Sequence, residues 1–204
     1  MRWQTGMAER LARGYGIASV AIDAVEHGDR LAGGPILDRD AAWAERQKRR
    51  NNPDEAFYEH MIADWKATLD FVLGIGAPSA AIGYFGLSMG TRYGLPFLAM
   101  EPRIRVAVLG LNGIVPGEPT TPDHIMVKRL LAKAAARMSI PIHFIVQDGD
   151  ELFPRENSLS LFDAIASSDK HLHLNPGGHG DVPVSEMEFA AAFLASHLKP
   201  VTTI

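Results

Sequence analysis

The sequence predicts an α/β fold with a doubly wound, mostly parallel sheet. Short apolar runs alternate with helical patterns along the chain, as in sheets built from strand-helix-strand units. The run over 104–109 is apolar almost throughout, which is typical of a strand covered on both faces. Polar, glycine-rich loops follow several of these runs, and in such sheets ligands bind outside the carboxyl ends of the strands.

Composition narrows the kinds of protein that the chain can be. With 204 residues, 47% of them hydrophobic, it can bury the core of one domain over residues 1–204. A net charge of -4 gives no reason to expect nucleic acid or an anionic membrane as partner. The absence of cysteine excludes disulfides and thiolate chemistry. No apolar stretch forms a leader or spans a bilayer, so we expect a cytoplasmic protein, with its oligomeric state open and a homo-oligomer included.

Hydrophobic periodicity and start and stop residues predict about five strands and seven helices. The strands are predicted over 17–22, 81–85, 104–109, 142–146 and 171–174. The helices are predicted over 7–13, 41–48, 53–73, 91–100, 122–138, 156–166 and from 185 onward. Asn52 and Pro53 suit the start of the third helix, and Ser185 to Glu188 form a capping-box pattern for the last. The segments 24–52 and 111–139 follow strands, so we expect helical cap insertions over a cleft.

The sequence Gly86-Leu87-Ser88-Met89-Gly90 is a G-x-S-x-G pattern between a predicted strand and a predicted helix. A serine on so tight a turn has strained backbone angles, so the positions two before and two after it should be nearly free of side chain, as Gly86 and Gly90 are. The amide of Met89 would open the helix and face a developing oxyanion. Leu87 is a candidate for lining a substrate pocket. The pattern therefore predicts that Ser88 is a nucleophile.

A serine hydroxyl needs a base to take its proton and a carboxylate to orient that base. Asp150 and His179 both follow later predicted strands, so Ser, Asp and His occur in the chain order of a nucleophile-elbow triad. Asp148 competes with Asp150 for the role of the acid. Glu151 is a third alternative.

The chain has eight histidines, and His179 alone combines a glycine-rich loop at a strand end with a position after the acid. His171 and His173 alternate within one predicted strand and His143 lies within another, so we interpret these three as structural. His27 is the rival for the base, because it too lies near the cleft edge. No cluster of His, Asp and Glu has convincing metal-ligand spacing, so we predict no catalytic metal.

Together these motifs resemble the α/β-hydrolase superfamily, and within it the prokaryotic branch of dienelactone-hydrolase-like proteins and general esterases. The resemblance covers essentially the whole chain. It rests on G-L-S-M-G at Ser88, on Ile22-Asp23-Ala24 with His27-Gly28, on D-E-x-x-P from Asp150 to Pro154 and on P-G-G-H at His179. It favours Asp150 as the acid, and it implies hydrolysis of a small carboxylic ester or lactone through an acyl-serine, without a metal or organic cofactor.

The beginning of the chain departs from the superfamily pattern, in which strands precede the first helix found here and a loop after the third strand supplies a second oxyanion donor. Gly33-Gly34 does not replace that loop, because it follows the strand that ends at Asp23. We therefore expect an N-terminally shortened hydrolase that lacks an interior strand. Three functions stay open: a serine esterase or lactonase, a non-catalytic relic that acts as a binding or interaction protein, and a thioesterase, peptidase or acyltransferase on the same triad.

Overall fold

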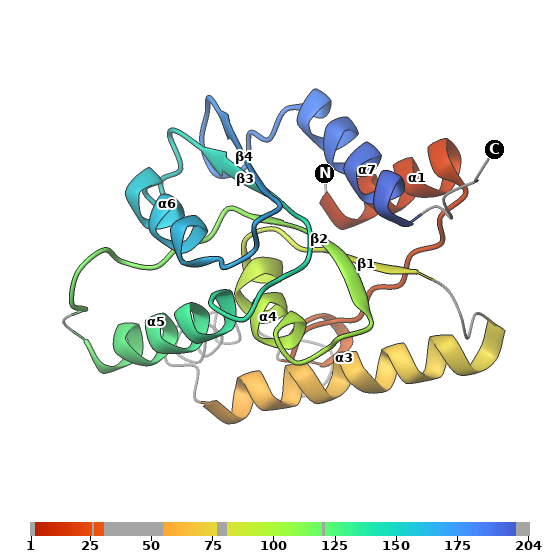
Figure 1. The fold of residues 1–204 in the computed structure, drawn as a ribbon, viewed down its shortest axis with the longest axis horizontal. Helices are drawn as coiled ribbons and strands as arrows, with labels where there is room; N and C mark the ends of the chain where they lie inside the picture. Colours follow the sequence, from red (N-terminus) through yellow and green to blue (C-terminus); the bar gives the residue numbers. More distant parts are fainter. Residues whose placement is uncertain (1–2, 26, 31–54, 77–80, 120, 199–204) are drawn as a thin grey trace, which may run out of the picture.

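One parallel sheet of four strands organises the part of the chain that the computed structural model describes, residues 3–25, 27–30, 55–76, 81–119 and 121–198. The strands are β1 (Ile82–Phe85), β2 (Ile104–Gly110), β3 (Ile142–Gln147) and β4 (Lys170–Asn175). They lie side by side in chain order, and each neighbouring pair is parallel (Figure 1). The carboxyl ends of all four strands therefore meet at one edge of the sheet.

Helices cover both faces of this sheet, which confirms the doubly wound α/β class. The helices are α1 (Trp3–Tyr15), the short 3-10 helix η1 (Gly28–Arg30), α3 (Glu55–Gly76), α4 (Met89–Leu98), α5 (Pro122–Ala135), α6 (Arg155–Ala164) and α7 (Val184–Leu198). Val106 and Val108 of β2 pack with α1 and α7, whereas Ala107 and Leu109 pack with α3, α4, α5 and α6. Among the described helices, none combines the length and the apolar character needed to cross a bilayer.

The predicted helix 7–13 is present in the structure as part of α1. The helix ends at Tyr15, before Gly16, whose φ of 67° suits glycine, and the amides of Gly16 and Ile17 close the last turn on Ala12 and Leu11. The helix is longer than predicted and includes Gly14. The predicted helix 41–48, the start residues Asn52 and Pro53 and most of the expected insertion 24–52 lie outside the described residues.

The predicted strand over 17–22 is wrong. These residues have no regular secondary structure, none of them pairs with a strand among the described residues, and Val20 is 51% exposed. A β-strand needs a neighbour that satisfies its backbone N–H and C=O groups. Within the described chain, β1 pairs with β2 alone, so the sheet has four strands where the sequence predicted about five.

The predicted capping box at Ser185 is also wrong. Helix α7 begins one residue earlier, and the amides of Glu186 and Met187 bond to the carbonyl of Pro183 at 3.1 and 3.2 Å. The side chain of Glu186, in the first turn of this helix, points toward strands β3 and β4. In the second expected insertion, 111–139, helix α5 packs against α4 and α6.

Candidate active site

Ser88 occupies the turn between β1 and α4 with φ 56° and ψ -113°, a backbone conformation that residues other than glycine rarely adopt. Several bonds tie this turn to the end of β2. The amide of Ser88 bonds to the carbonyl of Gly110 at 2.9 Å, and the amide of Gly86 to Val108 at 3.0 Å. The buried hydroxyl of Thr91 accepts from the Gly110 amide at 2.8 Å and lies 2.7 Å from the carbonyls of Gly86 and Gly110. The strained turn is therefore held from the neighbouring strand.

The two glycines of the pattern differ in their need to be glycine. A Cβ on Gly86 would lie 2.6 Å from the ring of Tyr84 and 2.8 Å from the backbone of Gly90. A Cβ on Gly90 would meet nothing within 4 Å, so the expectation that Gly90 must be free of side chain is wrong. The hydroxyl of Tyr84 donates to the Gly90 carbonyl at 2.8 Å, and burial raises its pKa, which keeps it protonated. Gly94, which the sequence did not single out, leaves room for that hydroxyl, since its Cβ would lie 2.2 Å away.

His179 and Asp150 converge on Ser88 from the loops after β4 and β3. The Nε2 atom of His179 lies 2.9 Å from the Oγ of Ser88, and its Nδ1 lies 2.8 Å from Oδ2 of Asp150. The side chain of Asp150 is 1% exposed, and its second oxygen accepts from the amides of Leu152 and Phe153, each at 2.9 Å. The structure thus brings together the three residues predicted as nucleophile, base and acid.

The alternatives weighed for the acid and the base have other partners. Asp148 is exposed and pairs with Arg155 at 2.9 Å. Glu151 accepts from the backbone amide of His179 at 2.9 Å, and this hydrogen bond lowers the pKa of its carboxyl. His27 bonds through Nδ1 to the carbonyl of Val25 at 2.8 Å. None of these three side chains is bonded to Ser88 in the described structure.

Met89 and Leu87 flank the serine with opposite orientations. Met89 is the first residue of α4, and its N–H makes no hydrogen bond to the described backbone, as is usual in the first turn of a helix. Its amide is therefore available to an anion beside the serine. Leu87, expected in a substrate pocket, is instead 2% exposed and packs with Met7 and Leu11 of α1. That expectation is wrong, because Leu87 is buried in the core between the sheet and α1.

The chain is similar to solved structures of esterases. A polyethylene-glycol-bound structure of a cold-adapted esterase from an Arctic intertidal metagenomic library is 33% identical, with 98% of this chain and 77% of that chain covered and a TM-score of 0.76. The chain belongs to the esterases of the α/β-hydrolase superfamily. A zinc-bound structure of a cold-adapted esterase from that library is 35% identical over 72% of this chain and 66% of that chain, with a TM-score of 0.61.

A more distant structure shows only that the fold is shared. The monoacylglycerol lipase of Paleococcus ferrophilus is 18% identical, with 69% of this chain and 76% of that chain covered and a TM-score of 0.53. No protein-family profile and no curated protein matches the sequence. Membership of the dienelactone-hydrolase-like branch stays a prediction.

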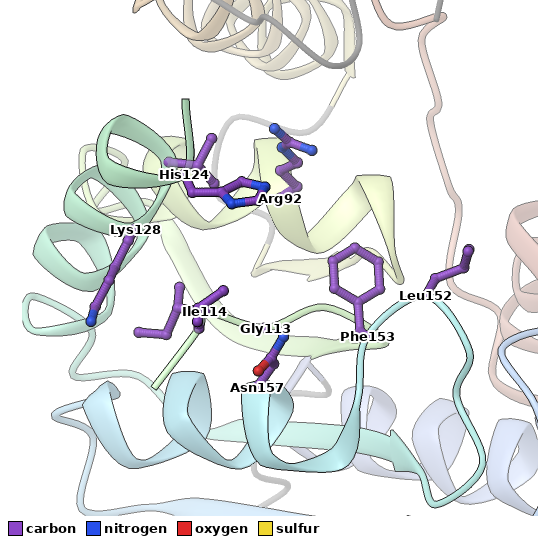
Figure 2. Close-up of a pocket in the computed structure, with 10 residues that line it drawn as sticks. Arg92, Gly113, Ile114, His124, Lys128, Leu152, Phe153 and Asn157 are labelled. Carbon is purple, nitrogen blue, oxygen red and sulfur yellow. The ribbon is translucent and has the colours of Figure 1, made fainter. Parts of the chain in front are cut away.

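A cavity of about 350 Å³ lies beside Leu152 and Phe153, which follow Asp150 in the loop after β3 (Figure 2). Its walls come from α4, α5, the segment after β2, the loop after β3 and the start of α6, and they include Arg92, Ile114, Phe153 and Asn157. None of these residues belongs to a motif that marks it as a pocket residue in the sequence. Only Arg92 could have been selected from the sequence, because it lies one helical turn after Ser88 on the helix that begins at the elbow.

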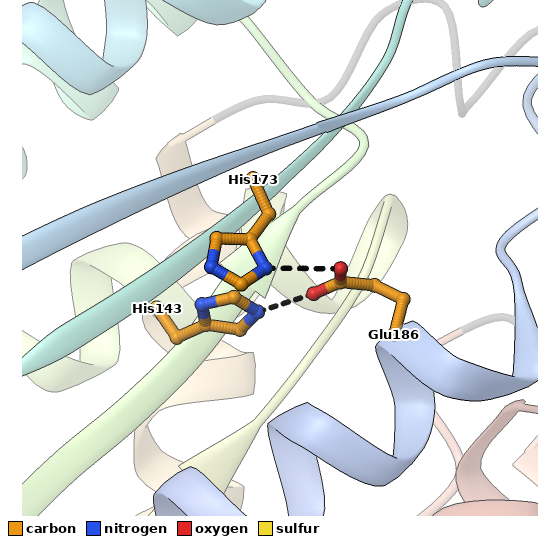
Figure 3. Close-up of side chains that lie close together, drawn as sticks. All are labelled: His143, His173 and Glu186. Carbon is orange, nitrogen blue, oxygen red and sulfur yellow. Dashed lines mark hydrogen bonds and ion pairs between the residues drawn. The ribbon is translucent and has the colours of Figure 1, made fainter.

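His143, Glu186 and His173 form a second polar cluster, on the α7 side of the sheet. Their potential ligand atoms lie within 4.8 Å of one another, so they could hold a metal ion. In Figure 3 the carboxylate of Glu186 instead accepts from His143 Nε2 at 2.5 Å and from His173 Nδ1 at 3.0 Å. A metal-bound histidine usually donates its second N–H to an acceptor. The Nδ1 of buried His143 has no hydrogen-bond partner among the described residues, so we interpret the cluster as a hydrogen-bonded bracket, the His-Glu-His bracket.

Proposed function

We propose that this esterase hydrolyses a small carboxylic ester, with lactones included, through an acyl-enzyme formed on Ser88. His179 acts as the general base and acid, and Asp150 orients its ring. The observation that carries the proposal is the continuous chain of hydrogen bonds from Asp150 through His179 to the Oγ of Ser88, at 2.8 and 2.9 Å.

In the first half of the reaction, Nε2 of His179 takes the proton of Ser88 as Oγ bonds to the ester carbonyl carbon. The carbonyl oxygen becomes an oxyanion, to which the Met89 amide donates at the positive end of α4. The buried carboxylate of Asp150 stabilises the imidazolium. Collapse of the tetrahedral intermediate breaks the bond to the alkoxy oxygen, which receives the proton from His179, and leaves an acyl-serine.

In the second half, water replaces the alcohol and the same groups repeat their roles. His179 accepts a proton from a water molecule while the oxygen of that water attacks the acyl carbon, and the Met89 amide again donates to the oxyanion. The proton then passes to Oγ of Ser88 as the acid product leaves. With a lactone, the alcohol stays tethered to the acyl group, and the single product is a hydroxy acid.

Covalent labelling of Ser88 tests the nucleophile directly. We expect a fluorophosphonate probe to label the wild-type protein, and p-nitrophenyl butyrate to give a burst of p-nitrophenol followed by turnover. Both signals should disappear in Ser88→Ala and persist in Ser185→Ala, which removes the hydroxyl of an exposed serine on α7. A folded wild-type protein that neither reacts with the probe nor cleaves the ester would contradict the proposal.

The reaction class needs a separate comparison, because one triad serves several acyl transfers. An oxygen ester, a thioester and an amide with the same acyl group should be offered to the wild-type protein. We expect the oxygen ester to have the highest kcat/KM. A thioester or amide cleaved faster would replace the ester assignment while it kept Ser88 as the nucleophile.

A further inference from the structure

Two residues that line the cavity in Figure 2, Phe153 and Arg92, contact residues of the proposed triad. The ring of Phe153 lies 5.8 Å from the ring of His179, and the Phe153 amide bonds to Asp150. Across the cavity, the amide of Arg92 bonds to the carbonyl of Ser88 at 3.0 Å. A group bound in this cavity is therefore close to an ester positioned at Ser88.

The described lining of the cavity carries basic side chains and no acidic ones. Arg92 comes from α4, and His124 and Lys128 come from α5; no Asp or Glu is among the described lining residues (Figure 2). None of the ion pairs within the described chain involves these three side chains. The whole protein has a net charge of -4, so this positive region stands out on an acidic molecule and would attract anions.

Arg92 is fixed in place before any ligand arrives. Its Nε donates to the hydroxyl of Tyr58 at 2.8 Å, and Tyr58 is 2% exposed, with its ring edge-on to Tyr93 at 5.5 Å. The two terminal nitrogens of Arg92 have no hydrogen-bond partner within the described residues. A guanidinium held by one edge can offer its remaining N–H groups to both oxygens of a carboxylate. Asn157, on the opposite wall of the cavity in Figure 2, adds a neutral amide to the polar groups of the lining.

We propose that the preferred substrate is an ester that carries a carboxylate, such as a half-ester of a short dicarboxylic acid, and that Arg92 binds this carboxylate. The inference rests on the proposed function, because it assigns a substrate class to the same site. A cavity of about 350 Å³ is near the lower end of ligand pockets, so the substrate is small. Ile114 and Phe153 provide apolar contacts for the carbon chain between the ester and the carboxylate.

Two esters of equal chain length test the charge preference. Monoethyl glutarate is an anion at neutral pH, and ethyl valerate is its neutral analogue. We expect wild-type kcat/KM to favour the anion about 10- to 100-fold at low salt, the range of a charge-assisted hydrogen bond. Raising NaCl from about 20 mM to about 0.5 M should reduce this preference, because salt screens the attraction between opposite charges.

Substitutions should locate the charge responsible. Arg92→Met keeps a long apolar stem and should lower the anion-to-neutral ratio of kcat/KM by about 10-fold or more. Lys128→Met should lower the ratio less, because its ammonium group already donates to the carbonyl of Gly117. Arg155→Met is the matched control, since Arg155 is exposed and pairs with Asp148 outside the lining, and it should leave the ratio unchanged.

The outcomes separate this inference from the proposed function. If fluorophosphonate labels Ser88 but the wild-type ratio is near one and Arg92→Met does not change it, the carboxylate inference is overturned and the hydrolase stands. If Ser88 is not labelled and neither ester is cleaved, the proposed function is overturned. Calorimetric titration of Ser88→Ala with glutarate then tests carboxylate binding in the cavity independently of hydrolysis. Saturable binding that disappears in Ser88→Ala/Arg92→Met supports the role of Arg92, and the absence of binding contradicts it.

Discussion

The two halves of the Ser88–His179 pair are held in place in different ways. The elbow around Ser88 is fixed partly by residues close to it in sequence, since Tyr84 bonds to Gly90 and Thr91 contacts the carbonyl of Gly86, and partly by the end of β2, the strand that follows α4. The loop that carries His179 is fixed by residues much earlier in the chain. Gln147 donates to the carbonyls of Pro176 and Gly178 at 3.1 and 3.3 Å, and Asp150 and Glu151 bond to the side chain and the amide of His179.

The far end of the His179 loop is anchored by the His-Glu-His bracket. Glu186 lies in the first turn of α7, directly after the loop, and it joins this helix to His143 on β3 and His173 on β4. Both ends of the loop are therefore tied to the sheet by side chains that are distant in sequence. The proposed nucleophile therefore has bonds between near neighbours in addition to tertiary bonds to β2, whereas the proposed base is positioned chiefly by residues distant in sequence. We expect variants of the two regions to have different effects.

The largest expected effect is on the His179 side, in Asp150→Asn. The asparagine cannot supply the negative charge that orients His179 and stabilises its imidazolium, so we expect kcat for p-nitrophenyl butyrate to fall about 10³- to 10⁴-fold. Asp148→Asn is the control, because Asp148 is exposed and pairs with Arg155 alone among the described residues, and kcat should change little. Similar losses in both variants would contradict the assignment of Asp150.

The next effect tests the local construction of the elbow with Gly86→Ala and Gly90→Ala. The first places a methyl group against Tyr84 and the Gly90 backbone, so we expect the free energy of unfolding to fall by about 1–3 kcal/mol and kcat to fall with it. The second adds a methyl group in open space within a helix, where alanine is favoured over glycine by about 0.5–1 kcal/mol. Urea unfolding measures both variants. Equal destabilisation of the two variants would show that both positions require glycine, and it would contradict the explanation by the close contacts of Gly86.

The sequence was most informative where the structure is local. A strand, a tight turn and a helix succeed one another around Ser88, so the residues themselves indicate the elbow. His179 could be selected from eight histidines because its glycine-rich loop follows a strand. Asp150 and Asp148 could not be separated by their positions in one loop alone. The difference between them is tertiary: Asp150 is buried against His179, whereas Asp148 faces solvent beside Arg155.

The parts that could not be predicted depend on partners distant in the chain. The run 17–22 has the composition of a strand, but strand formation requires a neighbour, and none pairs with it among the described residues. Leu87 looked accessible beside the serine, yet it packs against α1. His143 and His173 lie on the same face of the sheet only because His143 is in register with His171. That register is set by packing, and the sequence of either strand alone does not determine it.

A smaller effect is expected when the His-Glu-His bracket is broken in Glu186→Gln. The buried carboxylate accepts from two imidazoles, and a neutral amide accepts more weakly, so we expect the free energy of unfolding to fall by about 1.5–3 kcal/mol. Because the bracket anchors the His179 loop, kcat should fall modestly as well. Glu188→Gln is the control, an exposed site on the same helix, and it should change neither quantity. Unchanged stability in Glu186→Gln would contradict the anchoring role.

The smallest expected effect is the pH dependence of the same bracket. Burial alone would raise the pKa of Glu186, but hydrogen bonds from His143 and His173, together with their charges, outweigh it and hold the pKa below its ordinary value. A carboxyl whose pKa is lowered by folding contributes stability that is complete above its unfolded pKa of about 4.3 and is lost as the pH falls through the folded pKa. The difference in unfolding free energy between wild type and Glu186→Gln should therefore shrink as the pH falls below about 4.3. Subtracting the variant removes the titration of carboxyls elsewhere in the chain, so a difference that stays constant into acid would mean that packing, and not the ionised hydrogen bonds, anchors the His179 loop.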